Sequence, residues 1–222
     1  AYEDLETFSY SVAHDLRAPL RGIDGFAHII KEDYFEQLDE FGKSSIDTII
    51  GSATKMNQLI DDILAFSMVS QSEMNKDKFS MNKLVDDVLG ILPISQDYPS
   101  VSITVAPQMP QAYGDRKMIA QVLQNLLTNA LKYTRAVEQP QITIGFKEHQ
   151  NKGFYFVQDN GIGFDQSHEK RIFRLFNRLV GDEYEGSGIG LTIAKRIIKK
   201  HKGTIAVISK PGEGSTFLFN LG

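Results

Sequence analysis

The N-terminal stretch from Phe8 to Arg21 reads F-S-Y-S-V-A-H-D-L-R-A-P-L-R, with a histidine and an aspartate side by side at its centre. Apolar residues recur around it at steps of three and four, the spacing of one helix face: Leu5, Phe8, Val12, Leu16, Leu20 and Ile23. His14 follows Val12 by two residues, so it lies roughly 200° around the helix from that face. We therefore expect its imidazole to point toward solvent or a docking partner.

A proline follows this histidine within the same predicted helix. Pro19 has no N–H to donate to the carbonyl of Asp15, so we expect the helix to loosen or bend there. Taken alone, an exposed histidine beside an aspartate is ordinary helix surface. The functional interpretation therefore depends on the rest of the chain.

Composition limits the classes of protein that the chain can represent. Its 222 residues are 41% hydrophobic, enough for one large or two small domains with a core. A net charge of -4 gives no reason to expect nucleic acid or an anionic membrane as partner. The absence of cysteine excludes disulfides, thiol catalysis and cysteine-ligated zinc. No apolar run approaches a membrane span, and no signal peptide is visible.

Two helices are predicted at the N-terminal end, over residues 3–32 and from near Lys43 onward. The second carries a wide apolar stripe: Ile46, Ile49, Ile50, Ala53, Met56, Leu59, Ile60, Ile63, Leu64 and Met68. Two such stripes cannot bury each other fully within one hairpin, so we expect two copies to form a four-helix bundle. Packing of the stripes on the C-terminal half is the alternative. We prefer the dimer because polar residues 70–78 separate the halves like a linker.

The C-terminal half mixes predicted strands and helices. Ser80 is placed to cap a helix, Gly114-Asp115 forms a turn and cap before a helix over 116–133, and a helix over 190–201 is closed by Gly203. Strands are predicted at 101–105, 142–147, 154–158, 204–209 and 216–221. This order suggests a sheet with helices on one face.

Three motifs in this half suit a nucleotide. Asn125 and Asn129 share a helix face, and such amides suit a hydrated Mg²⁺ with its phosphates. Asp159 opens D-N-G-I-G at a strand end, where a carboxylate can accept from an exocyclic amine. The sequence G-S-G-I-G-L at 186–191 opens a helix and can present N–H groups to phosphate. Each motif alone also fits a simpler interpretation, namely a polar helix face, a plain turn or a glycine-rich loop.

The order of these motifs is more specific than any one of them. The histidine segment, the asparagine helix, D-N-G-I-G, the F-R-L-F of residues 173–176, G-S-G-I-G-L and G-E-G-S-T-F at 212–217 follow one another. In this order the chain resembles the sensor histidine kinases of two-component signalling over nearly its whole length. The stretch A-H-D-L-R-A-P-L-R resembles kinase modules that follow phytochrome-type or PAS-type sensors.

The resemblance implies an α+β protein. Residues 1–72 would form a helical hairpin that dimerises into a four-helix bundle and carries the phosphotransfer histidine. Residues 73–222 would form an α/β-sandwich ATP-binding domain of the gyrase and histidine kinase type. The chain would then be a cytoplasmic fragment of a homodimeric kinase, whose upstream sensor domain is absent and whose partner is a response regulator receiver domain.

The resemblance also implies the roles of individual residues, with ATP and Mg²⁺ as cofactors. His14 would accept the γ-phosphoryl group, and Asp15 would orient the imidazole and take its proton. The remaining assignments are Asn125 and Asn129 to Mg²⁺; Lys132 and Tyr133 to phosphate and ribose; Asp159 to adenine, with Gly161 and Gly163 beside it; Gly186, Gly188 and Gly190 to the phosphate-side loop; Leu191 and Thr216 to the nucleotide; and Arg178 to the terminal phosphates.

Ala18 departs from the family pattern. Many relatives carry Thr or Asn four residues after the histidine, where it helps position a water for dephosphorylating the partner. Since a methyl group cannot hydrogen-bond that water, we expect weak phosphatase activity. Two other functional classes remain open: a stand-alone ATPase related to gyrase and mismatch-repair proteins, and a catalytically silent, nucleotide-gated interaction module.

Overall fold

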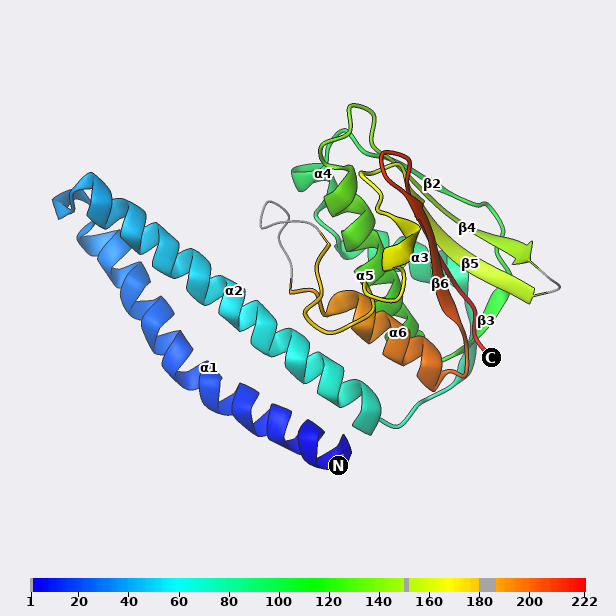
Figure 1. The fold of residues 1–222 in the computed structure, drawn as a ribbon, viewed down its shortest axis with the longest axis horizontal. Helices are drawn as coiled ribbons and strands as arrows, with labels where there is room; N and C mark the ends of the chain where they lie inside the picture. The colour runs from blue at the N-terminus through cyan, green and yellow to red at the C-terminus, as the bar shows by residue number, and fades with distance from the viewer. Residues whose placement is uncertain (1, 150–151, 180–186) are drawn as a thin grey trace. The chain divides into compact units, whose positions relative to one another are not determined.

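A computed structural model describes residues 2–149, 152–179 and 187–222 (Figure 1). The chain divides into two compact units, Ala1–Gln71 (unit 1) and Ser72–Gly222 (unit 2), and each is described by itself. Unit 1 is helical, and unit 2 combines a mixed sheet with helices. The α+β fold class predicted from the sequence is therefore confirmed. Within the described residues, no helix has both the length and the apolar character needed to cross a membrane.

Unit 1 is a hairpin of two long helices, α1 (Tyr2–Asp33) and α2 (Glu40–Gln71), joined through the short 3-10 helix η1 (Phe35–Gln37). The second helix begins three residues before the predicted start near Lys43. The reason is a cap, since the carboxylate of Asp39 accepts a hydrogen bond from the N–H of Gly42 at 2.7 Å.

Buried residues recur every seven residues along both helices. They are Ala13, Leu20 and Ala27 in α1 and Ile46, Ala53, Ile60 and Ser67 in α2. A seven-residue repeat is typical of helices that pack along a left-handed seam. Small residues alternate with large ones along it, which lets the two helices approach closely.

A second series of apolar residues, also spaced by seven, begins three residues later on α1. In the single chain this second series, called the open series, is exposed to solvent. Leu16 is 48% exposed and Ile23 is 53% exposed. On α2, Ile49 and Met56 occupy the equivalent open series. One neighbouring helix therefore covers only part of a stripe this wide, as expected for a hairpin that cannot bury both of its stripes by itself. Leu5, Phe8 and Val12 have side chains outside the described residues.

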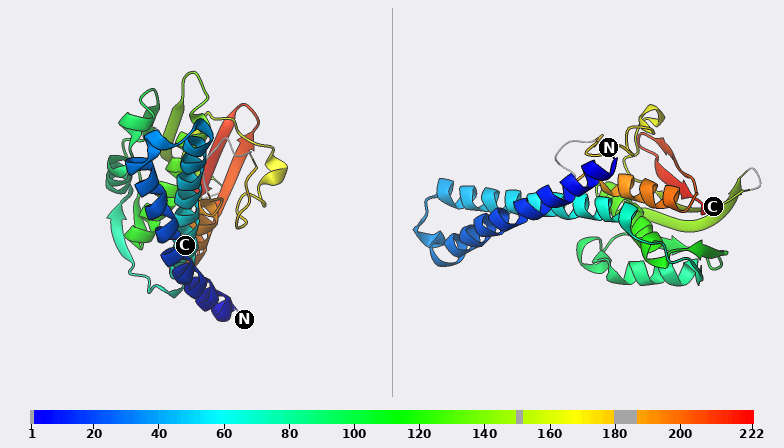
Figure 2. Two further views of the ribbon diagram at one scale, coloured as in Figure 1. Left: turned by 90° about the vertical axis from the view of Figure 1, so that its left-hand side faces the viewer. Right: turned by 90° about the horizontal axis from the view of Figure 1, so that it is seen from below.

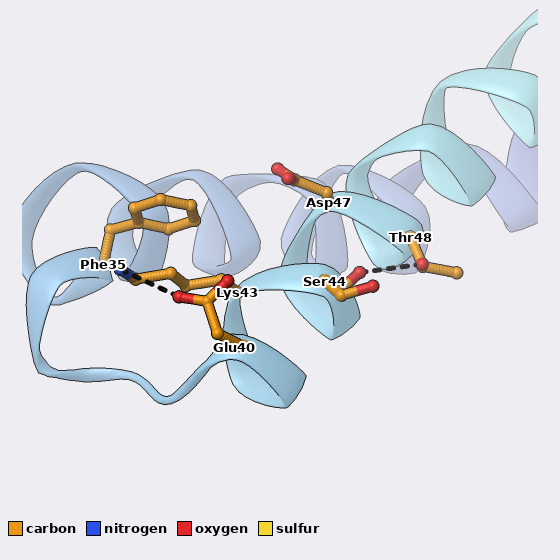
Figure 3. Close-up of a pocket in the computed structure, with 6 residues that line it drawn as sticks. All are labelled: Phe35, Glu40, Lys43, Ser44, Asp47 and Thr48. Carbon is orange, nitrogen blue, oxygen red and sulfur yellow. Dashed lines mark hydrogen bonds and ion pairs between the residues drawn. The ribbon is translucent and has the colours of Figure 1, made fainter.

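Side chains of η1 and of the first turns of α2 line a pocket near the bend (Figure 3). The ammonium of Lys43 lies 5.4 Å from the centre of the Phe35 ring and 3.7 Å from the carboxylate of Glu40. Lys31 of α1 pairs with Asp47 of α2 at 2.8 Å. Exposed ion pairs of this kind contribute roughly 0–1 kcal/mol each, so the bend depends mainly on the apolar seam for its stability.

Unit 2 contains two sheets and a layer of helices. Its elements are β1 (Asp77–Ser80), α3 (Met81–Ile91), α4 (Ile94–Asp97), β2 (Ser102–Val105), β3 (Gln111–Gly114), α5 (Arg116–Thr134), β4 (Gln141–His149), β5 (Lys152–Asp159), η2 (Gln166–His168), α6 (Gly190–Lys200), β6 (Ile205–Lys210) and β7 (Gly214–Phe219). The main sheet has the order β2-β4-β5-β7-β6, with β2 and β4 parallel and the other pairs antiparallel. β1 and β3 form a separate antiparallel pair.

Helix α5 is central to unit 2. It packs against β4, β5 and β7 and also against α3 and α6, so the helices form a layer on the sheet (Figures 1 and 2). Its buried face includes Val122, Leu126 and Leu127, which are fully shielded from solvent. Both asparagines of the predicted site lie at the edge of this buried face and are half-buried, whereas Gln124 and Thr128 are exposed.

Two predicted helix caps are confirmed. The hydroxyl of Ser80 accepts from the N–H of Lys83 at the start of α3. The carboxylate of Asp115 accepts from the N–H groups of Lys117 and Met118 at the start of α5. Gly114, however, ends strand β3 rather than forming a turn.

The C-terminal end of α6 differs from the prediction. Lys202, not Gly203, takes the left-handed conformation, with φ of 61°. The N–H of Lys202 donates to Lys199, and the N–H of Gly203 donates to Ile198, both at 2.9 Å, which is the Schellman arrangement. Gly203 is still required, because a Cβ there would lie 2.0 Å from the carbonyl oxygen of Asn220.

Candidate functional site

One face of α5 carries the polar residues predicted for Mg²⁺ and phosphate. Asn125, Asn129, Lys132 and Tyr133 are all half-buried. The Nδ2 atom of Asn125 is buried and has no hydrogen-bond partner among the described residues. A buried amide donor without a partner is costly, so this atom marks a place where a ligand with acceptor oxygens would stabilise the site.

The helix α6 begins beside this face. A Cβ placed on Gly190 would lie 3.1 Å from the Oδ1 atom of Asn125, so the first residue of α6 contacts the asparagine side chain directly. Leu191 is half-buried in the same turn. The amino end of a helix presents free N–H groups and the positive end of the helix dipole, which favours an anion at this point.

The loop before α6 approaches the segment that follows F-R-L-F. Gly188 has φ of +73°, and a Cβ there would lie 3.2 Å from the carbonyl oxygen of Asn177 and 3.3 Å from Cγ of Arg178. The Oδ1 atom of Asn177 is buried without a hydrogen-bond partner in the part of the chain that the structure describes. The structure thus brings Gly188, Gly190, Asn125 and Arg178 into one region. Gly186 lies outside the described residues.

Two cations lie close together in this region. Burial, and after it the charge of Arg178, lowers the pKa of Lys132 from 10.5 to about 8. The ammonium of Lys132 also lies 4.3 Å from the centre of the Tyr133 ring. Cations held near each other and partly away from water are stabilised by an anionic ligand, so this pair suits phosphate.

Asp159 stands at the end of β5 and is 5% exposed. Its Oδ1 atom accepts from the N–H of Gly161 at 2.9 Å and from the N–H of Ser215 at 3.3 Å. Burial raises the pKa of Asp159 from 3.8 to about 6, although these two hydrogen bonds oppose the rise. Oδ2 accepts no hydrogen bond within the described part of the chain, and it is the oxygen that remains for a ligand.

The glycines of D-N-G-I-G bring the end of α5 close to Asp159. A Cβ on Gly161 would lie 2.5 Å from the carbonyl oxygen of Tyr133, and one on Gly163, with φ of +58°, would lie 2.0 Å from the carbonyl oxygen of Lys210. The N–H of Ile162 donates to Tyr133 at 3.2 Å. These glycines therefore have a role in packing against the protein's own backbone, apart from any role beside a flat ring.

The sheet register groups Ser215, rather than Thr216, with the aspartate. Asp159 pairs with Ser215 across β5 and β7, whereas Thr216 pairs with Gln158. Paired residues share a face of the sheet and successive residues alternate, so Thr216 lies on the opposite face. The sequence analysis did not identify Ser215. Its place beside Asp159 follows from the strand register, which cannot be read from the sequence.

The predicted acceptor segment lies in unit 1. The backbone of His14 is in α1, while its side chain is outside the described residues. Asp15, Ala18 and Pro19 are exposed. Arg17, one turn beyond the histidine, forms an ion pair with Asp61 of α2, which connects this part of α1 to its neighbour.

The described residues contain no cluster of three or more His, Cys, Asp or Glu side chains that could hold a metal ion. Within these residues, a metal ion would therefore not be held by a cluster of carboxylates. The amide oxygens of the asparagine face suit a Mg²⁺ ion that keeps most of its waters. These amide oxygens are few and neutral, so they suit a Mg²⁺ ion that is also bound by a phosphate.

Two family descriptions match this chain. Residues 4–72 match "His Kinase A (phospho-acceptor) domain", and residues 114–222 match "Histidine kinase-, DNA gyrase B-, and HSP90-like ATPase". Together the two matches cover most of the sequence. The first includes the histidine of α1, and the second includes every predicted residue of the nucleotide site.

Individual relatives agree. The chain is 37% identical to cyanobacterial phytochrome B of Nostoc sp. and 37% identical to the phytochrome-like protein Cph1 of Synechocystis sp., over 99% and 98% of its own length. It spans 29% of each of these proteins. The structure of full-length ShkA in complex with AMPPNP matches with a TM-score of 0.71 at 22% identity, over 96% of this chain and 45% of that one. The chain belongs to the sensor histidine kinase family and resembles its phytochrome-type members.

Proposed function

We propose that this chain is the catalytic part of a protein-histidine kinase, in which unit 2 binds ATP and transfers its γ-phosphoryl group to His14 of unit 1. One observation carries the proposal. The asparagine face of α5, the start of α6 and the buried Asp159 converge within unit 2, in a chain whose first 72 residues match a phosphoacceptor family. Residues 1–72 are then the dimerisation and phosphotransfer domain, and residues 73–222 are the ATP-binding domain.

Asp159 recognises the adenine end of the nucleotide. Its Oδ1 is held by two backbone N–H groups, so Oδ2 is fixed in direction and can accept a hydrogen bond from the exocyclic amine. A carboxylate that sits in a dry site makes a strong, directional acceptor. Ser215, beside it on β7, joins this end of the site.

Lys132 and Arg178 bind the phosphate end, together with the N–H groups at the start of α6. Tyr133, whose carbonyl contacts the D-N-G-I-G segment, lies between the two ends and suits the ribose. Gly188 and Gly190 let the backbone come close to the phosphates. We assign Gly186 and Leu191 to the same region from the family resemblance alone.

Asn125 and Asn129 hold the Mg²⁺ ion with the phosphates, through amide oxygens and the ion's waters. When bound, the ion supplies charge neutralisation for the transferred group. The unpartnered Nδ2 of Asn125 supports a phosphate contact by the same side chain.

The transfer forms a bond between an imidazole nitrogen of His14 and the γ-phosphorus. The bond from that phosphorus to the bridging oxygen of the β-phosphate breaks, and ADP leaves with the electron pair. The proton on the imidazole passes to Asp15 and then to solvent. Neutral imidazole is a good nucleophile near pH 7, and the protein contributes mainly position and charge.

The partners follow from this reaction. The open series of Leu16, Ile23, Ile49 and Met56 supports a homodimer whose hairpins form a four-helix bundle. The phosphohistidine passes its group to an aspartate of a response regulator receiver domain, and an upstream sensor domain controls the reaction. We place the reaction in the cytoplasm, where ATP is available.

Incubation with γ-labelled ATP tests the function. The chain should take up acid-labile, alkali-stable label, and His14→Gln should take up none. His28→Gln is the matched control, because His28 is an exposed histidine on the same helix. Free phosphate without labelled protein would indicate a stand-alone ATPase, and neither product would indicate a silent module.

A further inference from the structure

The segment from Ser72 to Ser80, which follows α2, is fastened to unit 2 at three points. The Lys200 ammonium donates to the carbonyl oxygen of Ser72. The N–H of Asn75 donates to Oδ2 of Asp115 at 2.9 Å. Residues 77–80 form β1 and pair with β3. The attachment therefore begins at the first residue of the unit.

Asp115 uses every polar group that it has. Oδ1 caps α5 by accepting from Lys117 and Met118, Oδ2 holds Asn75, and its own N–H donates to Nε2 of His201 at 2.9 Å. The residue is 8% exposed. It therefore joins the segment after α2, the start of α5 and the end of α6 at one point.

His201 completes this junction. It is 1% exposed, and its Nδ1 lies 2.8 Å from the carbonyl oxygen of Ile197. A carbonyl can only accept, so Nδ1 carries the proton and Nε2 is the acceptor for Asp115. A Cβ on Gly114 would lie 2.8 Å from the ring. The ring therefore has a closely fitted seat that fixes α6 against the start of α5.

Hydrogen bonds, rather than close packing, hold the first part of the segment. A cavity of about 610 Å³ is lined by Ser72, Asn75 and Asp77 on one side and by Lys117, Met118 and Gln121 on the other. The lining shows that the segment does not pack tightly on α5. The Asn75–Asp115 bond is thus a major part of what holds residues 72–76 in place.

We propose that Asp115 is a positioning residue for phosphoryl transfer: it fixes the segment after α2 to α5, so that no free residues separate α2 from the nucleotide-binding unit. The proposal rests on the proposed kinase function. If residues 72–76 were free, these five residues would let the chain ends separate by roughly 11–13 Å, which lowers the effective concentration of bound ATP at His14. The nucleotide residues themselves begin at Asn125, about 15 Å along α5 from Asp115, so ATP binding is a separate property.

The test is Asp115→Asn in the whole chain. The asparagine retains an oxygen for the cap but replaces Oδ2 by an NH₂ group, which cannot accept from Asn75. Hydrogen exchange of residues 72–76 should speed up at least about tenfold. The maximal rate of autophosphorylation should fall about tenfold, while the Kd for Mg-ATP stays within about twofold.

Two further variants make the test specific. Asn75→Pro removes the donor of the same bond and leaves the cap and His201 unchanged, so it should slow autophosphorylation in the same way. Asp165→Asn is the matched control, because Asp165 caps η2 through the N–H of Ser167, and it should change neither exchange in residues 72–76 nor the rate.

The outcomes separate this proposal from the function on which it rests. Faster exchange with an unaltered rate would overturn the role of Asp115 alone. A loss of ATP affinity as large as the loss of rate would also overturn it, because the residue would then act through the binding site. A parent chain that takes up no label would overturn the kinase function, and the role of Asp115 with it.

Discussion

Unit 1 and unit 2 cover their apolar residues in different ways. The largest fully buried side chains of the described residues, among them Phe219, Leu126 and Ile197, lie in unit 2. Unit 1 buries one seven-residue series and leaves Leu16, Ile23, Ile49 and Met56 about half exposed. Unit 2 therefore has a complete core of its own, whereas unit 1 has a surface that a second copy can cover. The proposed function follows the same division, with the nucleotide site assigned to unit 2 and the acceptor to unit 1.

The largest expected effect separates these two functions. Asp15→Asn should slow autophosphorylation by roughly 10²–10⁴-fold, because it removes the group that we propose as base and orienter of His14, and should leave the Kd for ATP almost unchanged. Labelling rates and calorimetry on the same sample provide the measurement. Asp47→Asn, an exposed aspartate near the bend, is the control. A parallel loss of ATP affinity would show that Asp15 belongs to the nucleotide site instead.

The second effect concerns the open surface of unit 1. Ile23→Glu would place a carboxylate in the buried contact of a dimer, which costs several kcal/mol. The dimer dissociation constant should rise at least about a hundredfold, measured by sedimentation. Ile91→Glu, at an isoleucine of unit 2 that is 69% exposed, should leave it unchanged. If the parent chain sediments as a monomer at micromolar concentration, the proposed four-helix bundle is wrong.

The third effect lies within unit 2. Asp159→Asn keeps Oδ1 for Gly161 and Ser215 but replaces the ligand-facing oxygen by a donor. The Kd for ATP should rise about tenfold or more, as expected for a lost hydrogen bond to a charged group of about 1.5–3 kcal/mol. Calorimetry with an unchanged Kd would remove Asp159 from the adenine site.

The same variant should be more stable than the parent. The pKa of Asp159 is raised in the folded state from 3.8 to about 6. The folded state therefore binds this proton more tightly than the unfolded state. The resulting stabilisation is fully present below pH 3.8 and is lost as the pH rises through 6, so that the free energy of unfolding is about 3 kcal/mol lower at pH 8. Urea unfolding should show an advantage for Asp159→Asn at pH 8 that shrinks as the pH falls below 6. Loss of stability in the variant would contradict the raised pKa.

The smallest expected effect is the pH dependence of ATP binding. Affinity should weaken several-fold below about pH 6, where Asp159 gains a proton, and above about pH 8, where Lys132 loses one. Calorimetry at constant ionic strength provides the profile. Asp159→Asn should remove the acid limb, and Lys132→Arg, which stays charged, should remove the alkaline limb. Persistence of either limb in its variant would assign it to another group.

Sequence patterns predicted the elements that depend on nearby residues. Ser80 and Asp115 cap their helices as expected because a cap involves only the next three residues. The strands β1 and β3 were missed because each has four residues and depends on a partner more than 30 positions away. The end of α6 was misjudged because Lys202, a residue with no preference for positive φ, takes the position that favours glycine.

The motifs of the site could be predicted from the sequence, but the burial and the neighbours of its residues could not. Asn125, Asn129 and Asp159 are visible as types of residue in a recognisable order. That Asp159 is buried, and that Ser215 stands beside it, depends on how β7 aligns with β5. The junction of Asn75, Asp115 and His201 involves three residues far apart in the sequence. The sequence predicts that Asp115 caps α5, but it does not show that the same carboxylate also accepts from Asn75.

The seven-residue spacing of the seam in unit 1 gives each helix a phase. Leu20 and Ala27 lie at the same angle because two turns of the supercoiled helix return to the starting direction. A helix fused ahead of α1 would keep that phase only if its length changed in steps of seven residues. A change of one to three residues would turn His14 to a new angle while leaving the composition, charge and fold of both units unaltered. The length of a helix fused ahead of α1 would thus set the direction that His14 faces relative to that helix.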